Sequence, residues 1–186
     1  MNSEESRRTA LVIVASTRAA NEVYDDVSGP ELVKGLSSWG FAVTGPQVVA
    51  DGDPVAHALK SAAGRYDVIL TTGGTGITPT DTTPEVTEPL LDRQLPGIQE
   101  LLRAEGVRKG IPTAVLSRGL AGVAKGSLVI NLPGSRGAVR DALAVLADVI
   151  EHAVAQIAGS DHESRAPGRP EFRMPTVQPD AQHGEA

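Results

Sequence analysis

The sequence contains no cysteine, and this absence excludes several kinds of chemistry at once. Among its 186 residues there is no thiol to form a disulfide, act as a nucleophile or supply a thiolate metal ligand. The chain also has only four histidines, which are far apart and form no HExxH-type pair: His57, His152, His162 and His183. We therefore expect any bound metal to be a hard cation held by oxygen ligands.

Positive charge and long hydrophobic runs are scarce as well. The formal net charge is −6, and adjacent basic residues occur only at Arg7-Arg8 and Arg108-Lys109, so we expect no nucleic-acid partner. No segment approaches the roughly 20 apolar residues that a membrane helix needs. The first ten residues, MNSEESRRTA, lack the apolar segment of a secretory signal. These observations predict a soluble, cytoplasmic protein with no membrane partner.

Hydrophobic patterning predicts alternating strands and helices. Short apolar runs, several rich in β-branched residues, predict strands over 9–16, 41–50, 66–72, 112–119 and 126–134, the second interrupted near Gly45-Pro46. Apolar residues at helical spacing predict helices over 26–40, 53–65, 83–94, 96–107 and 135–159, with a break at Pro89 in the third. This alternation predicts an α/β fold, a three-layer α/β/α sandwich around a mostly parallel sheet.

One domain accounts for most of the chain. We expect it to span residues 9–159, after a flexible N-terminus at 1–8. Residues 160–186 contain four prolines and almost no periodic apolar pattern, which predicts a disordered tail. An arm that crosses to another subunit is the alternative, and Phe172 and Met174 are the only anchors it has.

The unusual residues gather in loops that follow the predicted strands. In open parallel sheets, ligands bind beyond the carboxyl ends of the strands. Four such loops read STRAANEVYDDVSGP, ADGDP, GGTGITPTD and PGSRG. Since these loops should meet at one edge of the sheet, they predict a single pocket.

The GGTG loop has the composition of an anion-binding site. Gly73, Gly74 and Gly76 allow backbone conformations in which successive N–H groups point toward one anion. Thr75 adds a hydroxyl, and the helix beginning near Pro84 adds its positive end. The loop matches neither the GxxxxGK[ST] pattern nor the GxGxxG pattern, so from the residues alone a plain flexible turn remains the alternative.

Two aspartates, Asp51 and Asp81, each follow a strand and are expected to face the same pocket. Carboxylates beside an anion site are best explained by Mg²⁺ lying between them and phosphates. Turn chemistry is the alternative reading of "DGD", in which we expect Asp53 to cap the next helix and Asp51 to be free. Asp81 has the same alternative, although Thr83 is better placed to cap the following helix.

Several serines and arginines in the other loops have two readings from sequence alone. Asp26 and Ser28 before Gly29-Pro30 are either helix caps or ligands, and Ser135 is either the cap of the long helix or a ligand. Arg136 either reaches a phosphate or faces solvent. "LSRG" at 116–119 puts Ser117 and Arg118 at a strand end, but it is not a GxSxG nucleophile motif.

Taken together, the loops resemble the molybdopterin-binding family of molybdenum-cofactor biosynthesis, of the MogA/MoaB type and including the G domain of gephyrin. The segment TTGGTGITPTDTTPE is the most specific match, and SGP, LPG, LSR and NLPGS follow the family in order and spacing. The resemblance covers roughly residues 9–159. It implies a Mg²⁺-dependent molybdopterin adenylyltransferase that moves AMP from ATP to the terminal phosphate of molybdopterin and releases pyrophosphate.

The resemblance also implies site residues and partners. Asp81 matches the essential aspartate after the glycine loop and Asp51 the aspartate of a "PDE"-like turn, so both are expected to be catalytic and to hold Mg²⁺. Phosphates of the nucleotide or pterin are expected at Ser28, Thr72, Gly73, Gly74, Thr75, Gly76, Ser117, Pro133, Gly134 and Ser135. Members are commonly trimers, so a homotrimer is expected, with a molybdenum-insertion enzyme as a downstream partner.

The chain departs from the family pattern in two places. The first loop reads STR where many members have SDR or SDT, and Glu105-Gly106-Val107 stands where close relatives often carry a serine near the pterin. These departures keep open a paralogue that binds molybdopterin without adenylylating it. A hydrolase of nucleotide-like pyrophosphates is a third reading, which ranks last because the extra C-terminal domain of such proteins is absent from this sequence.

Overall fold

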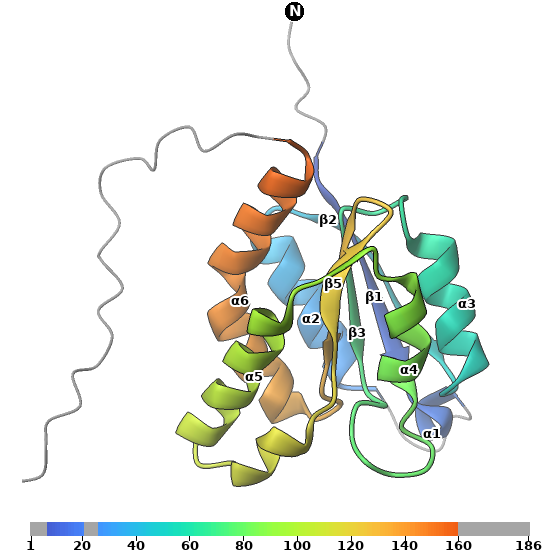
Figure 1. The fold of residues 1–186 in the computed structure, drawn as a ribbon, viewed down its shortest axis with the longest axis vertical. Helices are drawn as coiled ribbons and strands as arrows, with labels where there is room; N and C mark the ends of the chain where they lie inside the picture. Colours follow the sequence, from blue (N-terminus) through green and yellow to red (C-terminus); the bar gives the residue numbers. More distant parts are fainter. Residues whose placement is uncertain (1–6, 21–25, 160–186) are drawn as a thin grey trace, which may run out of the picture.

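A six-stranded mixed sheet forms the centre of the molecule (Figure 1). Its strand order is β2-β1-β3-β6-β5-β4. The computed structural model describes residues 7–20 and 26–159, so the predicted tail at 160–186 lies outside the described residues. Four strands pair in parallel: β1 (Thr9–Ala15), β2 (Ala42–Val49), β3 (Val68–Thr72) and β6 (Ser127–Leu132). Strand β5 (Ala121–Ala124) pairs antiparallel with β6 on one side and with β4 (Arg93–Gln94) on the other. The predicted sandwich around a mostly parallel sheet is confirmed.

Helices cover both faces of this sheet, as Figure 1 shows. One face packs against α2 (Ser28–Ser38), α5 (Pro96–Arg108) and α6 (Arg136–Ile157). The opposite face packs against α3 (Asp53–Ala62), α4 (Thr83–Thr87) and the 3-10 helix η1 (Glu88–Leu90). Two short elements complete the fold, α1 (Thr17–Ala20) after β1 and the 3-10 helix η2 (Pro112–Leu116) after α5.

Strand β1 illustrates why the central strands read as continuous apolar runs. Ala10 and Val12 belong to the core beneath α2 and α6, whereas Leu11 and Ile13 belong to the core beneath α3. Because successive side chains of a strand point to opposite faces, a strand covered on both sides must be apolar at every position. Strands β3 and β6 are buried along their whole length for the same reason.

The strand predicted at 112–119 is wrong. Residues Pro112–Leu116 form η2, and the strand of this region begins only at Ala121. Val115 and Leu116 are 59% and 47% exposed, so this short apolar run does not enter the core. Short apolar runs do not distinguish strands from helical turns by periodicity.

The segment from 83 to 94 is shorter as a helix than predicted. Helix α4 ends at Thr87, and Pro89 lies in the 3-10 turn that follows, which confirms the expected break. Arg93–Gln94 then forms the edge strand β4, which the sequence did not predict. In the described residues no helix combines the length and apolar composition that crossing a membrane requires.

Candidate functional site

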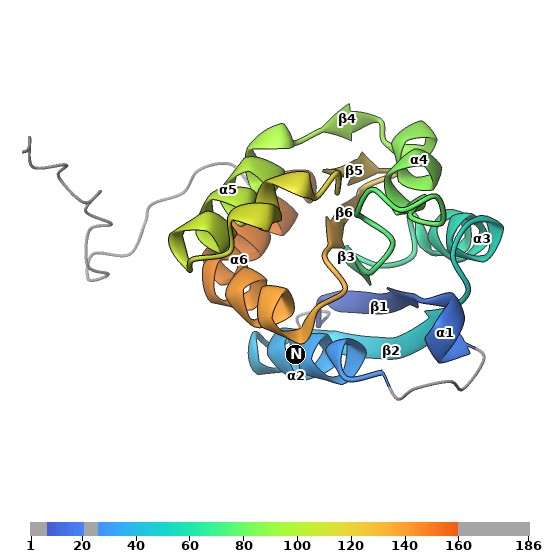
Figure 2. The same ribbon diagram turned by 90° about the horizontal axis from the view of Figure 1, so that it is seen from below.

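The loops after β1, β2, β3 and β6 surround one cavity of about 980 Å³. Figure 2 views the molecule from this end, with the green loop after β3 near the centre. All twelve residues that the sequence assigned to the site line this cavity: Ser28, Asp51, Thr72, Gly73, Gly74, Thr75, Gly76, Asp81, Ser117, Pro133, Gly134 and Ser135. The rule for parallel sheets therefore located the pocket correctly.

Gly73 is the point at which three strand ends meet. Its φ of +100° is in the region that side chains disfavour, and its N–H donates to the carbonyl of Leu132 at 3.0 Å. A Cβ on residue 73 would overlap the carbonyl oxygen of Ala15. A Cβ at the position of Gly134 would be only 3.2 Å from the Cα of Gly73. The glycine is therefore needed for the close approach of β1, β3 and the loop after β6.

Gly74 brings the glycine loop against Asp51. Its φ is +62°, and a Cβ there would overlap the hydroxyl oxygen of Thr83 and lie 3.0 Å from Oδ1 of Asp51. The carbonyl of Gly74 accepts a hydrogen bond from the N–H of Thr83 at 3.0 Å. The absence of a side chain thus leaves an open backbone surface beside a carboxylate.

Asp51 is fixed through one of its two oxygens. Oδ2 accepts hydrogen bonds from the N–H of Thr17 at 2.9 Å and from its hydroxyl at 2.7 Å. Within the described part of the chain, Oδ1 has no hydrogen bond and remains available on the side of Gly74. We expected the Asp51 carboxylate to be free of hydrogen bonds within the protein. This is wrong for Oδ2 and holds for Oδ1 alone.

The capping roles expected for Asp53 and Thr83 are wrong. Asp53 is the first residue of α3, and the residue at its cap position is Gly52, which has no side chain to accept a hydrogen bond. At α4 the cap position is Thr82, and no side-chain cap bond forms there either. The carboxylate of Asp81 is thus not committed to capping the helix that follows it.

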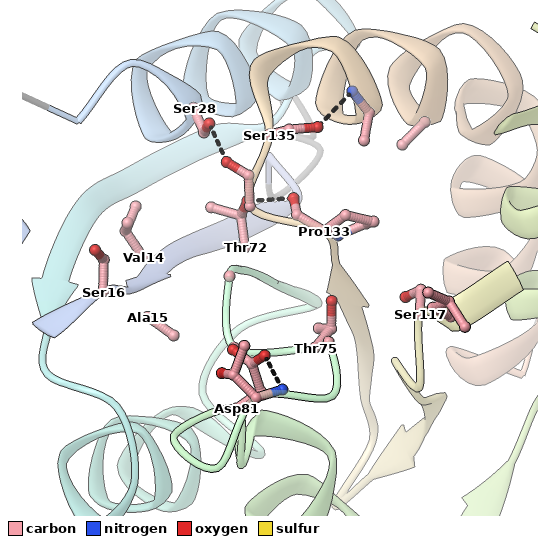
Figure 3. A pocket seen from close by; sticks show the side chains of 18 of the residues that line it. Val14, Ala15, Ser16, Ser28, Thr72, Thr75, Asp81, Ser117, Pro133 and Ser135 are labelled. Carbon is pink, nitrogen blue, oxygen red and sulfur yellow. Dashed lines mark hydrogen bonds between the residues drawn. The ribbon is translucent and has the colours of Figure 1, made fainter. Parts of the chain in front are cut away.

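Asp81 has the same arrangement as Asp51. Its Oδ2 accepts the N–H of Thr78 at 2.9 Å (Figure 3). Its own N–H donates to the carbonyl of Thr78 at 3.0 Å. Among the residues described, no hydrogen bond is found on Oδ1 of Asp81. Each aspartate therefore has one oxygen held by the protein and one that is available to a ligand in the cavity.

The charges around the cavity fit a Mg²⁺ ion that arrives with phosphates. In residues 7–20 and 26–159 there is no group of three or more acidic, histidine or cysteine side chains close enough to hold a metal alone. Mg²⁺ is commonly bound by one or two carboxylates together with substrate phosphates. The charged side chains of the cavity lining are mainly acidic, namely Asp26, Asp51, Asp81 and Asp141 beside Arg18 and Arg103. An anionic substrate would need a cation here.

Hydroxyl groups on the β6 side of the cavity hold the loops together. Thr72 donates from Oγ1 to the carbonyl of Pro133 at 2.8 Å, and Ser28 donates from Oγ to the carbonyl of Gly134 at 2.9 Å (Figure 3). The Asp26 carboxylate accepts the N–H of Ser28 at 3.0 Å. Of the two readings of Asp26, cap or ligand, this bond is the one expected of a cap. The two hydroxyl bonds fix the NLPGS loop against the end of β3 and the start of α2.

Ser135 is the N-cap of α6, and we expect its hydroxyl to contribute to stability. Its Oγ accepts the N–H of Ala138 at 3.3 Å, while the first turn of the helix lines the cavity. Ser135→Ala is expected to lower the free energy of unfolding by about 1 kcal/mol in urea denaturation, and Ser135→Gly by only a few tenths. Equal stabilities of Ser135→Ala and wild type would contradict the capping role.

Arg136 does not line the cavity. Its Nε lies 3.2 Å from Oε1 of Glu31, and Nη2 of Arg140 lies 2.7 Å from the same oxygen. Desolvation acts to raise the pKa of Glu31, but hydrogen bonds from Arg140 and Arg136 outweigh it, so the pKa is lowered. Of the two readings of Arg136, the solvent-facing one holds, because its side chain is 55% exposed and pairs with Glu31 at the surface.

The wall of the cavity opposite the glycine loop is largely apolar and comes from α5 and η2. Gly106 on α5 allows this wall to form, because a Cβ there would overlap the Cβ of Ala114 on η2. Glu105 turns away into an ion pair with Arg108, whose hydrogen bond lowers the pKa of that carboxyl. The apolar residues of this wall are Leu102, Ile111, Ala114 and Leu116.

Two residues that organise the site were given no role from the sequence. Thr17 binds Asp51 from 34 positions away, and Arg118 binds the loop before Asp81 from the segment after η2. Arg118 stands beside Ser117 in the LSRG motif, which was the available signal. Thr17 is the middle residue of STR, where many family members have aspartate, and that departure was the available signal.

Comparisons with known proteins point to one family. A family model described as "Probable molybdopterin binding domain" matches residues 11–152. A Helicobacter pylori protein named molybdopterin adenylyltransferase is 38% identical over 157 residues, covering 80% of this chain and 87% of that protein. Molybdenum cofactor biosynthesis protein B of Halalkalibacterium halodurans is 40% identical over 141 residues, covering 73% and 81%. The solved structure of a molybdopterin biosynthesis Mog protein from Mycobacterium ulcerans has a TM-score of 0.79 at 50% identity, covering 83% and 99%.

Proposed function

Because the chain belongs to the family of probable molybdopterin-binding domains and is an enzyme of molybdenum cofactor biosynthesis, we propose that it is a Mg²⁺-dependent molybdopterin adenylyltransferase. The observation that carries this proposal is the pair Asp51 and Asp81. Each presents an available carboxylate oxygen beside a glycine loop in the same cavity. Both aspartates and the loop lie within the matched residues 11–152.

The proposed reaction exchanges one phosphoanhydride bond for another. An oxygen of the terminal phosphate of molybdopterin attacks the α-phosphorus of ATP. A new P–O bond forms, the bond from that phosphorus to the β-phosphate oxygen breaks, and pyrophosphate leaves with the electron pair. Since the nucleophile is already an anion, catalysis depends on positioning and on neutralising charge more than on a general base.

Three parts of the cavity have defined roles in this proposal. The backbone of Gly74 to Gly76 binds phosphate, with the buried side chain of Thr75 beside it. The Oδ1 atoms of Asp51 and Asp81 hold Mg²⁺, which when bound supplies the positive charge that phosphoryl transfer requires. Gly134, Ser135 and the first turn of α6 help to hold the nucleotide or the pterin.

Ring binding is proposed for the apolar wall of α5 and η2. Ile111 and Leu116 are 44% and 47% exposed and line the cavity, so they offer apolar surface to a flat heterocycle. Ser117 lies at the edge of this wall and faces the same cavity (Figure 3). Adenine and the pterin are the two rings that the reaction brings together.

The proposal includes a homotrimer and a downstream molybdenum-insertion enzyme that receives the adenylylated product. Apolar side chains of Leu101, Val107 and Val115 are 37%, 45% and 59% exposed on α5 and η2, and burial against another subunit would remove them from water. Light scattering on the purified protein measures the assembly directly, and a monomer would contradict the proposed trimer.

Release of pyrophosphate tests the proposed reaction when molybdopterin binding is measured beside it. We expect release only when ATP, Mg²⁺ and molybdopterin are all present. Molybdopterin binding without pyrophosphate release would instead identify a binding paralogue. Cleavage of a nucleotide pyrophosphate in the absence of molybdopterin would identify a hydrolase.

A further inference from the structure

Arg118 connects both ends of the loop that carries Asp81. Its backbone N–H donates to the carbonyl of Thr75 at 2.9 Å. Its Nε donates to the carbonyl of Gly76 at 2.7 Å, and its Nη2 donates to the carbonyl of Asp81 at 2.6 Å. One side chain therefore spans the loop from the glycine end to the aspartate end.

The loop has few other constraints. Ile77 is 67% exposed, and the hydrogen bonds of residues 77–80 are internal ones that join Thr78 to Asp81 and to Thr80. Within the described ranges, every hydrogen bond linking residues 76–81 to another element comes from Arg118. Loops with few buried contacts open easily, so the position of Asp81 depends on this arginine.

The geometry requires a guanidinium group. Its planar N–H groups point in several fixed directions and can reach separate acceptors at the same time, which a lysine ammonium on a flexible stem cannot do as well. Nη1 of Arg118 also pairs with Glu85 on α4, and the hydrogen bond from Arg118 lowers the pKa of that carboxyl. Arg118 and Glu85 are 38% and 53% exposed, so the ion pair orients the arginine and adds little stability itself.

We propose that Arg118 is a positioning residue that holds the Gly76–Asp81 loop so that Oδ1 of Asp81 stays directed at the metal and phosphates. The expected change in kinetics rests on the proposed adenylyl transfer. The effect of Arg118 on the position of the loop is independent of that reaction. Arg118 is not proposed to touch the substrate. Its loss should therefore change kcat and the Mg²⁺ requirement more than the binding of molybdopterin.

Hydrogen–deuterium exchange tests the positioning without any substrate. The variants are Arg118→Met, which keeps the length of the side chain, and Arg118→Lys, which keeps the charge without the planar group. Arg140→Met is the matched control, because Arg140 is also an exposed arginine paired with a glutamate but lies outside the cavity lining. We expect the amides of Thr78 and Asp81 to exchange about tenfold faster in both Arg118 variants and at the wild-type rate in the control.

Steady-state kinetics and Mn²⁺ binding then separate positioning from other roles. In Arg118→Met and Arg118→Lys we expect kcat to fall about 10- to 100-fold with a weaker affinity for Mn²⁺ in the presence of ATP, while the KM for molybdopterin changes less than about twofold. Unchanged exchange of the loop would overturn the inference. A raised KM with unchanged kcat, or full rescue by lysine, would also overturn it. If the wild type transfers no AMP, the proposed function fails, and the exchange and Mn²⁺ measurements still decide the role of Arg118.

Discussion

Replacement of Asp81 by asparagine is expected to lower kcat for adenylyl transfer by about 10²- to 10³-fold while the protein remains folded. Asparagine keeps a side-chain oxygen that can accept the N–H of Thr78, so the turn from Thr78 to Asp81 can persist. The substitution removes the negative charge that the proposal assigns to Mg²⁺ binding. Measurement of kcat at saturating ATP and molybdopterin over a range of Mg²⁺ concentrations checks this expectation.

Asp92→Asn is a matched control for this variant. Asp92 also accepts a backbone N–H through Oδ2, from Lys125 at 2.6 Å, but it lies outside the cavity lining. We expect its kcat to equal that of wild type within about twofold. Asp51→Asn should act like Asp81→Asn, since its available oxygen faces the same glycine loop. Activity of Asp81→Asn within about threefold of wild type would contradict its role in catalysis.

Replacement of Gly73 by alanine is expected to lower the free energy of unfolding by about 3 kcal/mol. Its φ of +100° is strained for any residue with a Cβ, and the new methyl group would overlap the carbonyl oxygen of Ala15. Because that oxygen belongs to the backbone of a central strand, the overlap can be relieved only by moving β1 away from β3. Urea denaturation followed by circular dichroism measures the loss.

Gly137→Ala provides the matched control at a glycine without these constraints. Gly137 lies in the first turn of α6, and a Cβ there would meet no atom within 4 Å. Alanine favours helices more than glycine does, so we expect no loss and a gain of at most about 1 kcal/mol. If Gly73→Ala were as stable as Gly137→Ala, the close packing of the three strand ends would not be required for folding.

The parts of the fold that the sequence predicted well are those governed by local periodicity. Residues 9–16 were predicted as a strand from their continuous apolar run and 66–72 as a buried strand, and they contain the central strands β1 and β3. The apolar spacing over 135–159 corresponds to α6, with Val139, Leu146 and Ile150 in the core. Parallel strands bring their carboxyl ends to one edge of the sheet. The predicted strands were therefore enough to predict which loops surround the cavity.

The parts that failed depend on contacts between distant residues or on weak local preferences. Pro112–Leu116 is a short apolar run, but it forms a 3-10 turn beside α5, and periodicity over so few residues does not separate the two. Asp53 begins a helix as expected, yet the chain enters α3 one residue earlier at Gly52, so its side chain caps nothing. The hydrogen bond from Thr17 to Asp51 joins two different loops. A sequence pattern does not give the distance in space between such loops, so this bond could not be predicted.

The most direct test of the account follows the α-phosphate of ATP. With ATP labelled at that phosphate, we predict that the wild-type protein transfers the label to molybdopterin as AMP, with one pyrophosphate released per AMP transferred. Removal of Mg²⁺ by a chelator should stop the transfer, and Asp81→Asn should nearly abolish it. Label that stays in ATP while molybdopterin is bound, or label that appears only as free AMP, would contradict the account.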